Sequence, residues 1–371
     1  MSTLQSDEWD SRLGYLGARF GSGQGGIPKG KPLWRMTLPS ESLELDMICV
    51  GSDSMYCLDE SNTCYRINIE EGKVDWAVEC GAVELADLLI NKDYVVALPK
   101  VLDRASGEIV CDLEEMTGEL LDESGKMLLD GSILMRGCEI GEKPSVMKFD
   151  LVGKNLEKLE LGCSLDSPAG EAGLVYLWCG DELIKYDYRL REERWRVGGL
   201  VKEEDRMMLE FGDSIIVETQ GYLSSLKEID GNASINWVKS FGEISSLLDG
   251  AVAPALGMTG DMAYIARYGK CIVAIDNKNA KIIWEVILEN NPGKLKGIQN
   301  FCIVGDLLVC VLNKYLIVLD RFDGSEVWSG EKDFKAYSTQ AHMNKIIFSS
   351  LGGDILCYKW TEPYSSPVKP K

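Results

Sequence analysis

The sequence predicts an all-β protein, namely a β-propeller of eight four-stranded antiparallel blades whose ring is closed by pairing N-terminal with C-terminal strands. Three observations predict this fold. One short motif recurs along the chain, its copies lie 35 to 47 residues apart, and the strands at the two chain ends complete one blade only together. That spacing is the length of a four-stranded blade. Seven blades is the alternative, because the motif is most degenerate over residues 111–158.

The motif consists of an apolar run, an Asp or Asn, a turn with Gly four residues later, and Trp at the eighth position. Asn68, Gly72 and Trp76 form one copy. The alternating apolar run is typical of a half-buried strand. The side chain of Asp or Asn opens a turn by accepting hydrogen bonds from nearby backbone N–H groups, and Gly supplies the positive φ of a tight hairpin. The Trp is then expected to pack between neighbouring blades.

Eight positions take the place of the Trp and imply eight blades. Six of them are tryptophans, which we expect to be structural blade anchors. The positions in chain order are Trp34, Trp76, Cys111, Lys158, Trp195, Trp237, Trp284 and Trp328.

The first and last segments of the repeat region are each incomplete. Trp34 has no strands before it to complete a blade, and the strand-like runs 345–350 and 354–359 have no Trp-bearing strand after them. Pairing these ends would close the ring and remove its exposed edges.

This Asp-x-x-x-Gly-x-x-x-Trp hairpin resembles the repeat of pyrroloquinoline-quinone (PQQ)-like, or quinoprotein-type, propellers. Ala274 and Asp276 match the family form in one copy, and Gly72, Lys73 and Trp76 in another. The resemblance covers residues 31–360. It implies the fold, and it implies either a scaffold similar to the propeller lipoprotein of the bacterial BAM complex or a PQQ-binding oxidoreductase. A WD40-like repeat is disfavoured, because no anchor Trp precedes an Asp.

The two ends of the chain differ from the repeats. Residues 1–30 are expected to form a flexible arm with a Gly-rich linker at 21–26, and residues 361–371 a mobile, Pro-containing tail. The propeller is expected to span 31–360. The first ten residues have neither the basic nor the apolar region of a secretory signal and no lipid-anchor cysteine, although a signal removed from the chain would leave the same start.

Composition narrows the class of partner and compartment. The formal charge is −20 and no apolar run is long enough to span a bilayer, so we expect no nucleic-acid partner and no membrane insertion. The twelve cysteines are scattered singly through apolar stretches, which favours free buried thiols in the cytoplasm, a reducing compartment.

No catalytic or metal-ligating pattern stands out, so we expect neither a catalytic, a cofactor nor a metal site. His342 is the only histidine, and we expect it to be a structural residue of the last blade. Gly21, Gly23 and Gly26 spell GxGxxG, but Pro28 follows where a dinucleotide fold needs a helix. The near P-loop ending at Lys31 fails for the same structural reason.

Two functions remain. The first is a non-catalytic interaction scaffold or assembly subunit that binds protein partners. The alternative is a PQQ- or small-ligand-binding oxidoreductase, but the chain lacks the adjacent cysteines that many quinoprotein dehydrogenases carry.

One local segment is a candidate for partner binding, namely an arm with several apolar side chains. This arm could dock on a partner, pack back on the propeller or stay disordered. Its candidate contact residues are Trp9, Leu13, Tyr15, Leu16 and Phe20.

Overall fold

The structure is a computed structural model. It describes residues 19–21, 25–39, 49–50, 53–59, 61–81, 88–118, 120–127, 132–138, 145–159, 174–179, 181–187, 189–200, 206–211, 214–219, 222–240, 256–259, 262–267, 271–287, 300–312, 314–333, 335–336, 338–350, 352–360 and 363–367. The fold below is that of these residues.

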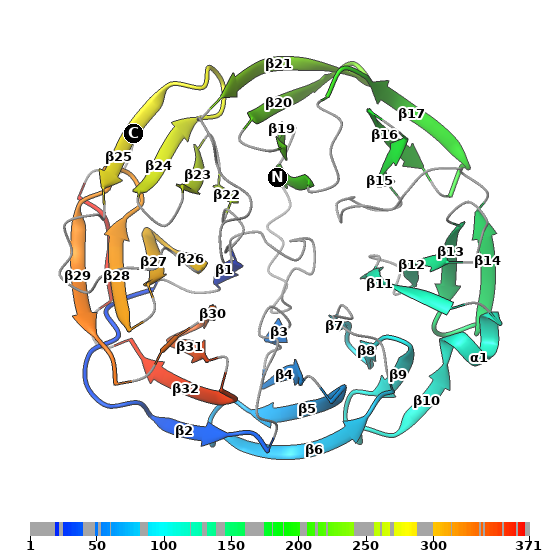
Figure 1. Ribbon diagram of the computed structural model, residues 1–371, viewed down its shortest axis with the longest axis horizontal. Coiled ribbons are helices and arrows are strands. Elements are labelled where there is room, and N and C mark those ends of the chain that lie inside the picture. Colours follow the sequence, from blue (N-terminus) through cyan, green and yellow to red (C-terminus); the bar gives the residue numbers. More distant parts are fainter. Residues whose placement is uncertain are drawn as a thin grey trace.

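The all-β prediction is confirmed. Within the described residues, the regular elements are β-strands apart from one short helix, α1 (Leu113–Thr117). The strands form eight separate sheets, and Figure 1 shows these sheets arranged around a common centre. Apart from β1 and β2, strands that are consecutive in the chain pair antiparallel within each sheet, so that each sheet is a meander that runs from the centre outwards.

The strands of the first four sheets follow chain order. The first two hold β3 (Cys49–Val50), β4 (Ser54–Leu58), β5 (Thr63–Asn68) and β6 (Lys73–Glu79), then β7 (Leu88–Ile90), β8 (Tyr94–Ala97), β9 (Lys100–Asp103) and β10 (Ile109–Asp112). The next two hold β11 (Leu120–Met127), β12 (Ile133–Cys138), β13 (Ser145–Asp150) and β14 (Asn155–Leu159), then β15 (Leu174–Cys179), β16 (Glu182–Asp187) and β17 (Glu192–Val197).

Of the remaining four sheets, the last two include a strand from the N-terminal part of the chain. Two hold β18 (Arg206–Phe211), β19 (Ser214–Thr219), β20 (Tyr222–Ile229) and β21 (Asn232–Ser240), then β22 (Leu256–Thr259), β23 (Met262–Arg267), β24 (Cys271–Asp276) and β25 (Ile282–Ile287). The last two hold β26 (Asn300–Val304), β27 (Leu307–Leu312), β28 (Tyr315–Asp320), β29 (Glu326–Glu331) and β1 (Arg19–Gly21), then β30 (Ser338–His342), β31 (Lys345–Ser349), β32 (Asp354–Lys359) and β2 (Trp34–Thr37).

Two sheets depart from the expected four strands. The β26–β29 sheet gains a fifth strand because β1 pairs in parallel with its innermost strand, β26. The sheet of β15, β16 and β17 has three strands among the residues that the structure describes. Trp195 lies on β17, the outermost of these three, so the sheet keeps the anchor position of the repeat.

Strands from opposite ends of the chain meet in the β30–β32 sheet. β2 is its outermost strand and pairs antiparallel with β32, with Trp34 opposite Cys357 and Thr37 opposite Asp354. The Thr37 hydroxyl donates to the Asp354 carboxylate at 2.6 Å, and Arg35 pairs with the same carboxylate at 2.7 Å. The last described blade therefore combines one N-terminal with three C-terminal strands.

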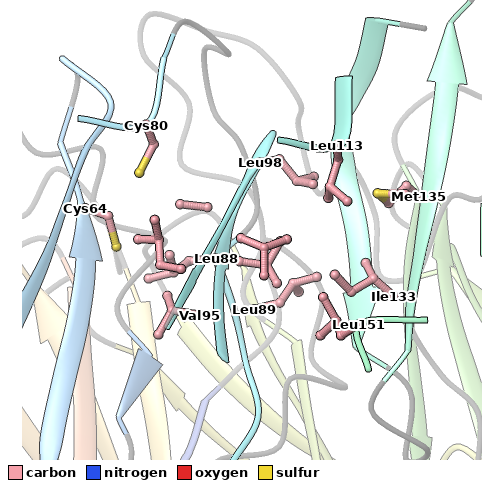
Figure 2. Close-up of a cluster of buried hydrophobic side chains, with 14 of the residues drawn as sticks. Cys64, Cys80, Leu88, Leu89, Val95, Leu98, Leu113, Ile133, Met135 and Leu151 are labelled. Carbon is pink, nitrogen blue, oxygen red and sulfur yellow. The ribbon is translucent and has the colours of Figure 1, made fainter. Parts of the chain in front are cut away.

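The core lies between neighbouring sheets. Figure 2 shows one such cluster, in which side chains from three consecutive sheets meet, among them Cys64 from β5, Leu88 from β7 and Ile133 from β12. These three side chains are fully or almost fully buried. Similar clusters join other neighbouring sheets, for example β22–β25 with β26–β29. Each sheet thus buries its faces against its neighbours, as expected for propeller blades.

Candidate interaction surface

The anchor tryptophans lie on the outermost strand of their sheets and reach across to the next sheet. The indole N–H of Trp76 donates to the backbone oxygen of Arg104 at 3.3 Å, and that of Trp284 donates to the backbone oxygen of Arg321 at 3.1 Å. Trp34 and Trp237 bind Ile69 and Asn277 in the same way. In all four cases the acceptor directly follows the Asp or Asn of the repeat.

The turn that receives the indole is built as the motif predicts. The Asp103 carboxylate accepts hydrogen bonds from the backbone N–H groups of Ala105 and Ser106 at 3.0 and 2.8 Å. The Gly107 N–H donates to the Asp103 carbonyl at 2.9 Å. Gly107 has φ of +76°, and a Cβ there would come within 2.8 Å of the Trp76 ring. Glycine is therefore needed at this position both for its conformation and for the space that the indole occupies.

A tyrosine that packs beside the anchor tryptophan is a second repeated aromatic residue, and the sequence motif did not predict it. Tyr56 lies beside Trp76, with the ring centroids 5.9 Å apart, and Tyr264 lies beside Trp284 at 6.0 Å. Tyr176 and Trp195 make the third such pair. A Tyr located 19 or 20 residues before the anchor Trp was the available signal.

At one interface between sheets, the indole N–H of the anchor tryptophan donates to a charged carboxylate and not to a backbone carbonyl. The hairpin between β20 and β21 is only two residues long, with Asp230 and Gly231 both at positive φ. The Trp195 indole there donates to the Glu228 carboxylate at 3.0 Å. Lys185, which is buried, donates to the same carboxylate oxygen at 2.7 Å. Burial alone would raise the pKa of Glu228, but these two hydrogen bonds and the lysine charge outweigh it and lower that pKa.

Segments from both chain ends lie against the β26–β29 sheet. Residues 25–28, within the expected arm of residues 1–30, are buried, and the Lys332 ammonium donates to the Pro28 carbonyl at 2.8 Å. In the expected tail, the Tyr364 hydroxyl donates to Asp320 at 2.7 Å and the Ser366 N–H donates to Asp306 at 2.9 Å. These parts of the arm and tail therefore contact the propeller.

The residues predicted to bind a partner fall mainly outside the described part of the chain. Trp9, Leu13, Tyr15 and Leu16 lie outside the described residues. Phe20 lies on β1, where its backbone is opposite Ile303 of β26. Partner binding by this arm stays a prediction.

A group of large apolar side chains is exposed on two neighbouring sheets, β18–β21 and β22–β25. We call this group the apolar rim because most of it belongs to the outermost strands β21 and β25 (Figure 1). Exposure reaches 53% at Val238 and 63% at Ile287. The apolar rim consists of Tyr222, Ile229, Ile235, Val238, Ile282, Ile283 and Ile287.

Hydrogen bonds join the two outer strands of the apolar rim. Asn236, Trp237 and Lys239 of β21 donate to backbone oxygens of the turn 277–280, which leads directly into β25. The exposed residues of β21 and the first residues of β25 are therefore neighbours across the interface between the two sheets. Exposed apolar side chains that gather on neighbouring elements are typical of a binding site for another protein.

The outer strand of another sheet is built differently. Four of the six residues of β17 are charged, whereas β25 has one charged residue in six and β21 one in nine. The charges of β17 also pair with one another; Arg196, for example, binds Glu193 at 2.7 Å. Charged side chains on an edge strand oppose pairing with another chain. β21 and β25 have little of this protection.

The histidine and most of the cysteine side chains among the described residues are buried. His342 lies on β30, and its side chain is buried. The eight cysteines whose side chains are described are free thiols, and burial raises the pKa of Cys57 and Cys310. No group of three or more potential metal ligands occurs within the part of the chain that the structure describes.

None of the described helical residues forms a segment with the length and apolarity to cross a membrane.

Comparison with known proteins shows the fold and nothing narrower. No protein-family model matches the chain, and no curated protein sequence is similar to it. Among solved structures, it is similar to BamB from Moraxella catarrhalis (TM-score 0.64, 13% identity, 90% of this chain and 100% of that one). Sqt1 from Saccharomyces cerevisiae is similar too (TM-score 0.66, 10% identity, 91% and 100%).

A third similar structure is the quinohemoprotein alcohol dehydrogenase from Comamonas testosteroni, with a TM-score of 0.64 and 11% identity over 96% of this chain and 80% of that one. Together with the sheets described above, these similarities show that the chain has a β-propeller fold. At such low identity they assign no activity, because one fold supports many functions.

Proposed function

We propose that this chain is a non-catalytic propeller that binds a protein partner through the apolar rim, as a scaffold or a subunit of a larger assembly. The observation that carries the proposal is the exposure of seven large apolar side chains on two neighbouring sheets. Burying such surface contributes about 25 cal/mol per Å². A rigid propeller can present it without changing shape on binding.

Two further features belong to the proposal. The eight sheets would be the blades of one ring, closed where β2 pairs with β32. The cytoplasm would be its compartment, because the described cysteines are free thiols and disulfides are rare in that compartment.

The test is capture of the partner by the purified, tagged chain from a lysate of the source organism. We expect a stoichiometric partner with the native chain and its loss with Val238→Lys combined with Ile287→Lys, because two charges would then have to be desolvated at the contact. Thermal unfolding of the variant shows whether it is folded.

The matched control is Val152→Lys, at an apolar residue that is 81% exposed in the turn between β13 and β14 of another sheet. It should keep the partner. Removing residues 1–18 tests the predicted contribution of the arm separately. Equal capture by the native chain and the double variant would contradict binding through the apolar rim, and no stable partner at all would contradict the scaffold function.

The structural similarity to a quinohemoprotein alcohol dehydrogenase favours one second candidate, a PQQ-binding oxidoreductase. Titration of the protein with PQQ and calcium, followed by absorbance, separates the two. We expect no stoichiometric uptake. Saturable binding with dye-linked alcohol oxidation would replace the scaffold proposal.

A further inference from the structure

The outer edge of β25 offers more than apolar side chains. β25 is the last strand of its sheet, so one side of its backbone has no partner strand among the described residues. Those N–H and C=O groups form a template that another extended chain satisfies best. Ile282, Ile283 and Ile287 are all exposed at this edge. The edge therefore combines free backbone groups with apolar side chains.

β21 is less suited to this role, although it is also an edge strand. Its side chains Asn236, Trp237 and Lys239 already bind the turn 277–280 of the neighbouring sheet. Its one charge, Lys239, is thus part of the contact between the two sheets. On β25, by contrast, Glu285 is exposed and is the only charged residue.

The overall charge of the chain and Glu285 favour one kind of chain at this edge, whereas the exposed Lys281 lies just before the strand and outside it. A second copy would bring another formal charge of −20 and its own Glu285 to the contact. Like charges facing each other across a strand pair are unfavourable, whereas a Lys or Arg opposite Glu285 is favourable. A basic strand of a different protein fits both the edge and the overall charge.

We propose that β25 binds an extended, basic segment of the partner as an additional strand, with apolar residues alternating along it and a Lys or Arg beside Glu285. This inference rests on the proposed function and specifies its partner. Backbone pairing supplies affinity, and the apolar and charged side chains select the sequence.

The experiment uses the full chain and two synthetic peptides, one of alternating lysine and valine and one of alternating glutamate and valine. Hydrogen–deuterium exchange is followed at the amides of β25 and, as an internal control, of β17. At a peptide concentration about ten times the dissociation constant, the lysine peptide should slow exchange at 282–287 about tenfold. It should leave β17 unchanged, and the glutamate peptide should protect neither strand.

Two variants test the components of the site. Glu285→Lys should reverse the preference, so that the glutamate peptide protects β25 and the lysine peptide does not. Ile283→Lys should abolish protection by the lysine peptide, whereas Val152→Lys should not. A thermal unfolding transition like that of the native chain shows for each variant that its fold is intact.

Three results would overturn the inference: no protection of β25 by the lysine peptide, equal protection by both peptides, or a dimer in sedimentation that Ile283→Lys abolishes. In the first two cases, loss of the native partner with Val238→Lys and Ile287→Lys would still support the proposed function. The failure of strand addition is therefore distinguishable from the failure of the scaffold.

Discussion

At two interfaces between neighbouring sheets, an anchor tryptophan occupies the same position of the repeat, but its indole N–H donates to a different kind of acceptor. Trp76 of β6 lies over a glycine turn and binds a backbone carbonyl, that of Arg104. Trp195 of β17 meets a shortened hairpin and binds the Glu228 carboxylate, which Lys185 neutralises. In both cases a Tyr packs against the Trp ring. The packing of Tyr against Trp is therefore shared, whereas the turn and the acceptor of the indole N–H differ.

This difference separates the packing of the repeat from its polar contacts. A turn carbonyl has no charge, so the contact with Trp76 needs no counter-ion. The Glu228 carboxylate can replace it only because Lys185 is buried beside it and lies 5.6 Å from the Tyr176 ring centroid. The hydrogen bond of Trp195 should therefore depend on the charge of its acceptor, whereas that of Trp76 goes to an uncharged carbonyl, which also accepts a hydrogen bond from Arg66 at 3.1 Å.

The largest effect is expected from removing a docked indole. Trp76→Ala and Trp195→Ala should each lower the free energy of unfolding by about 3–5 kcal/mol, because packing is shared by the two interfaces. Denaturant unfolding followed by circular dichroism measures both. A loss below about 1 kcal/mol at either site would mean that its indole contributes little to the interface.

The glycine turn can be tested with a matched pair of substitutions. Gly107→Ala and Gly231→Ala both place a Cβ at positive φ, which costs about 1–2 kcal/mol. Only at Gly107 does that Cβ meet an indole, at 2.8 Å from Trp76; at Gly231 nothing lies within 4 Å. Overpacking should add about 1–3 kcal/mol at Gly107 alone. Equal losses in chemical denaturation would contradict a role for the indole in selecting glycine.

The fold was predictable because its signal is local. Asn68, Gly72 and Trp76 lie within nine residues, and each has a chemical reason to stand where it does. The position of the Trp at the end of a hairpin fixes it to an outer strand, so one short pattern locates a whole blade.

The apolar rim was not predictable in the same way. The segment Ile282–Ile287 is almost entirely apolar, which in sequence is typical of a buried strand. Its exposure follows from its place at the outer edge of a sheet, which composition does not reveal. Lys185 and Glu228 are likewise 43 residues apart, and they meet only because two sheets pack.

A smaller effect is expected from removing the lysine of the charged interface. Lys185→Met keeps most of the apolar volume but leaves the Glu228 carboxylate without its counter-ion, so we expect a loss of about 1–3 kcal/mol at neutral pH. Lys73→Met is the control, because Lys73 pairs with Glu71 at an exposed site. The free energy of unfolding of this control variant should stay close to that of the native chain. Denaturant unfolding that shows equal losses would remove the distinction between the two pairs.

The smallest effect is the part of the pH dependence of stability that comes from Glu228. The pKa of Glu228 is lower in the folded chain than its ordinary value of 4.5, because hydrogen bonds from Lys185 and Trp195 outweigh burial. Its contribution to stability is therefore present above pH 4.5 and is lost as the pH falls through the folded pKa. Glu228→Gln lacks this titration, so the native chain should be more stable than the variant at pH 7, and the difference should shrink below pH 4.5. Other carboxylates titrate equally in both proteins and cancel in the difference. Unfolding curves at a series of pH values would contradict the assignment if the difference stayed constant, because the indole would then be held by geometry alone and not by the charge of its acceptor.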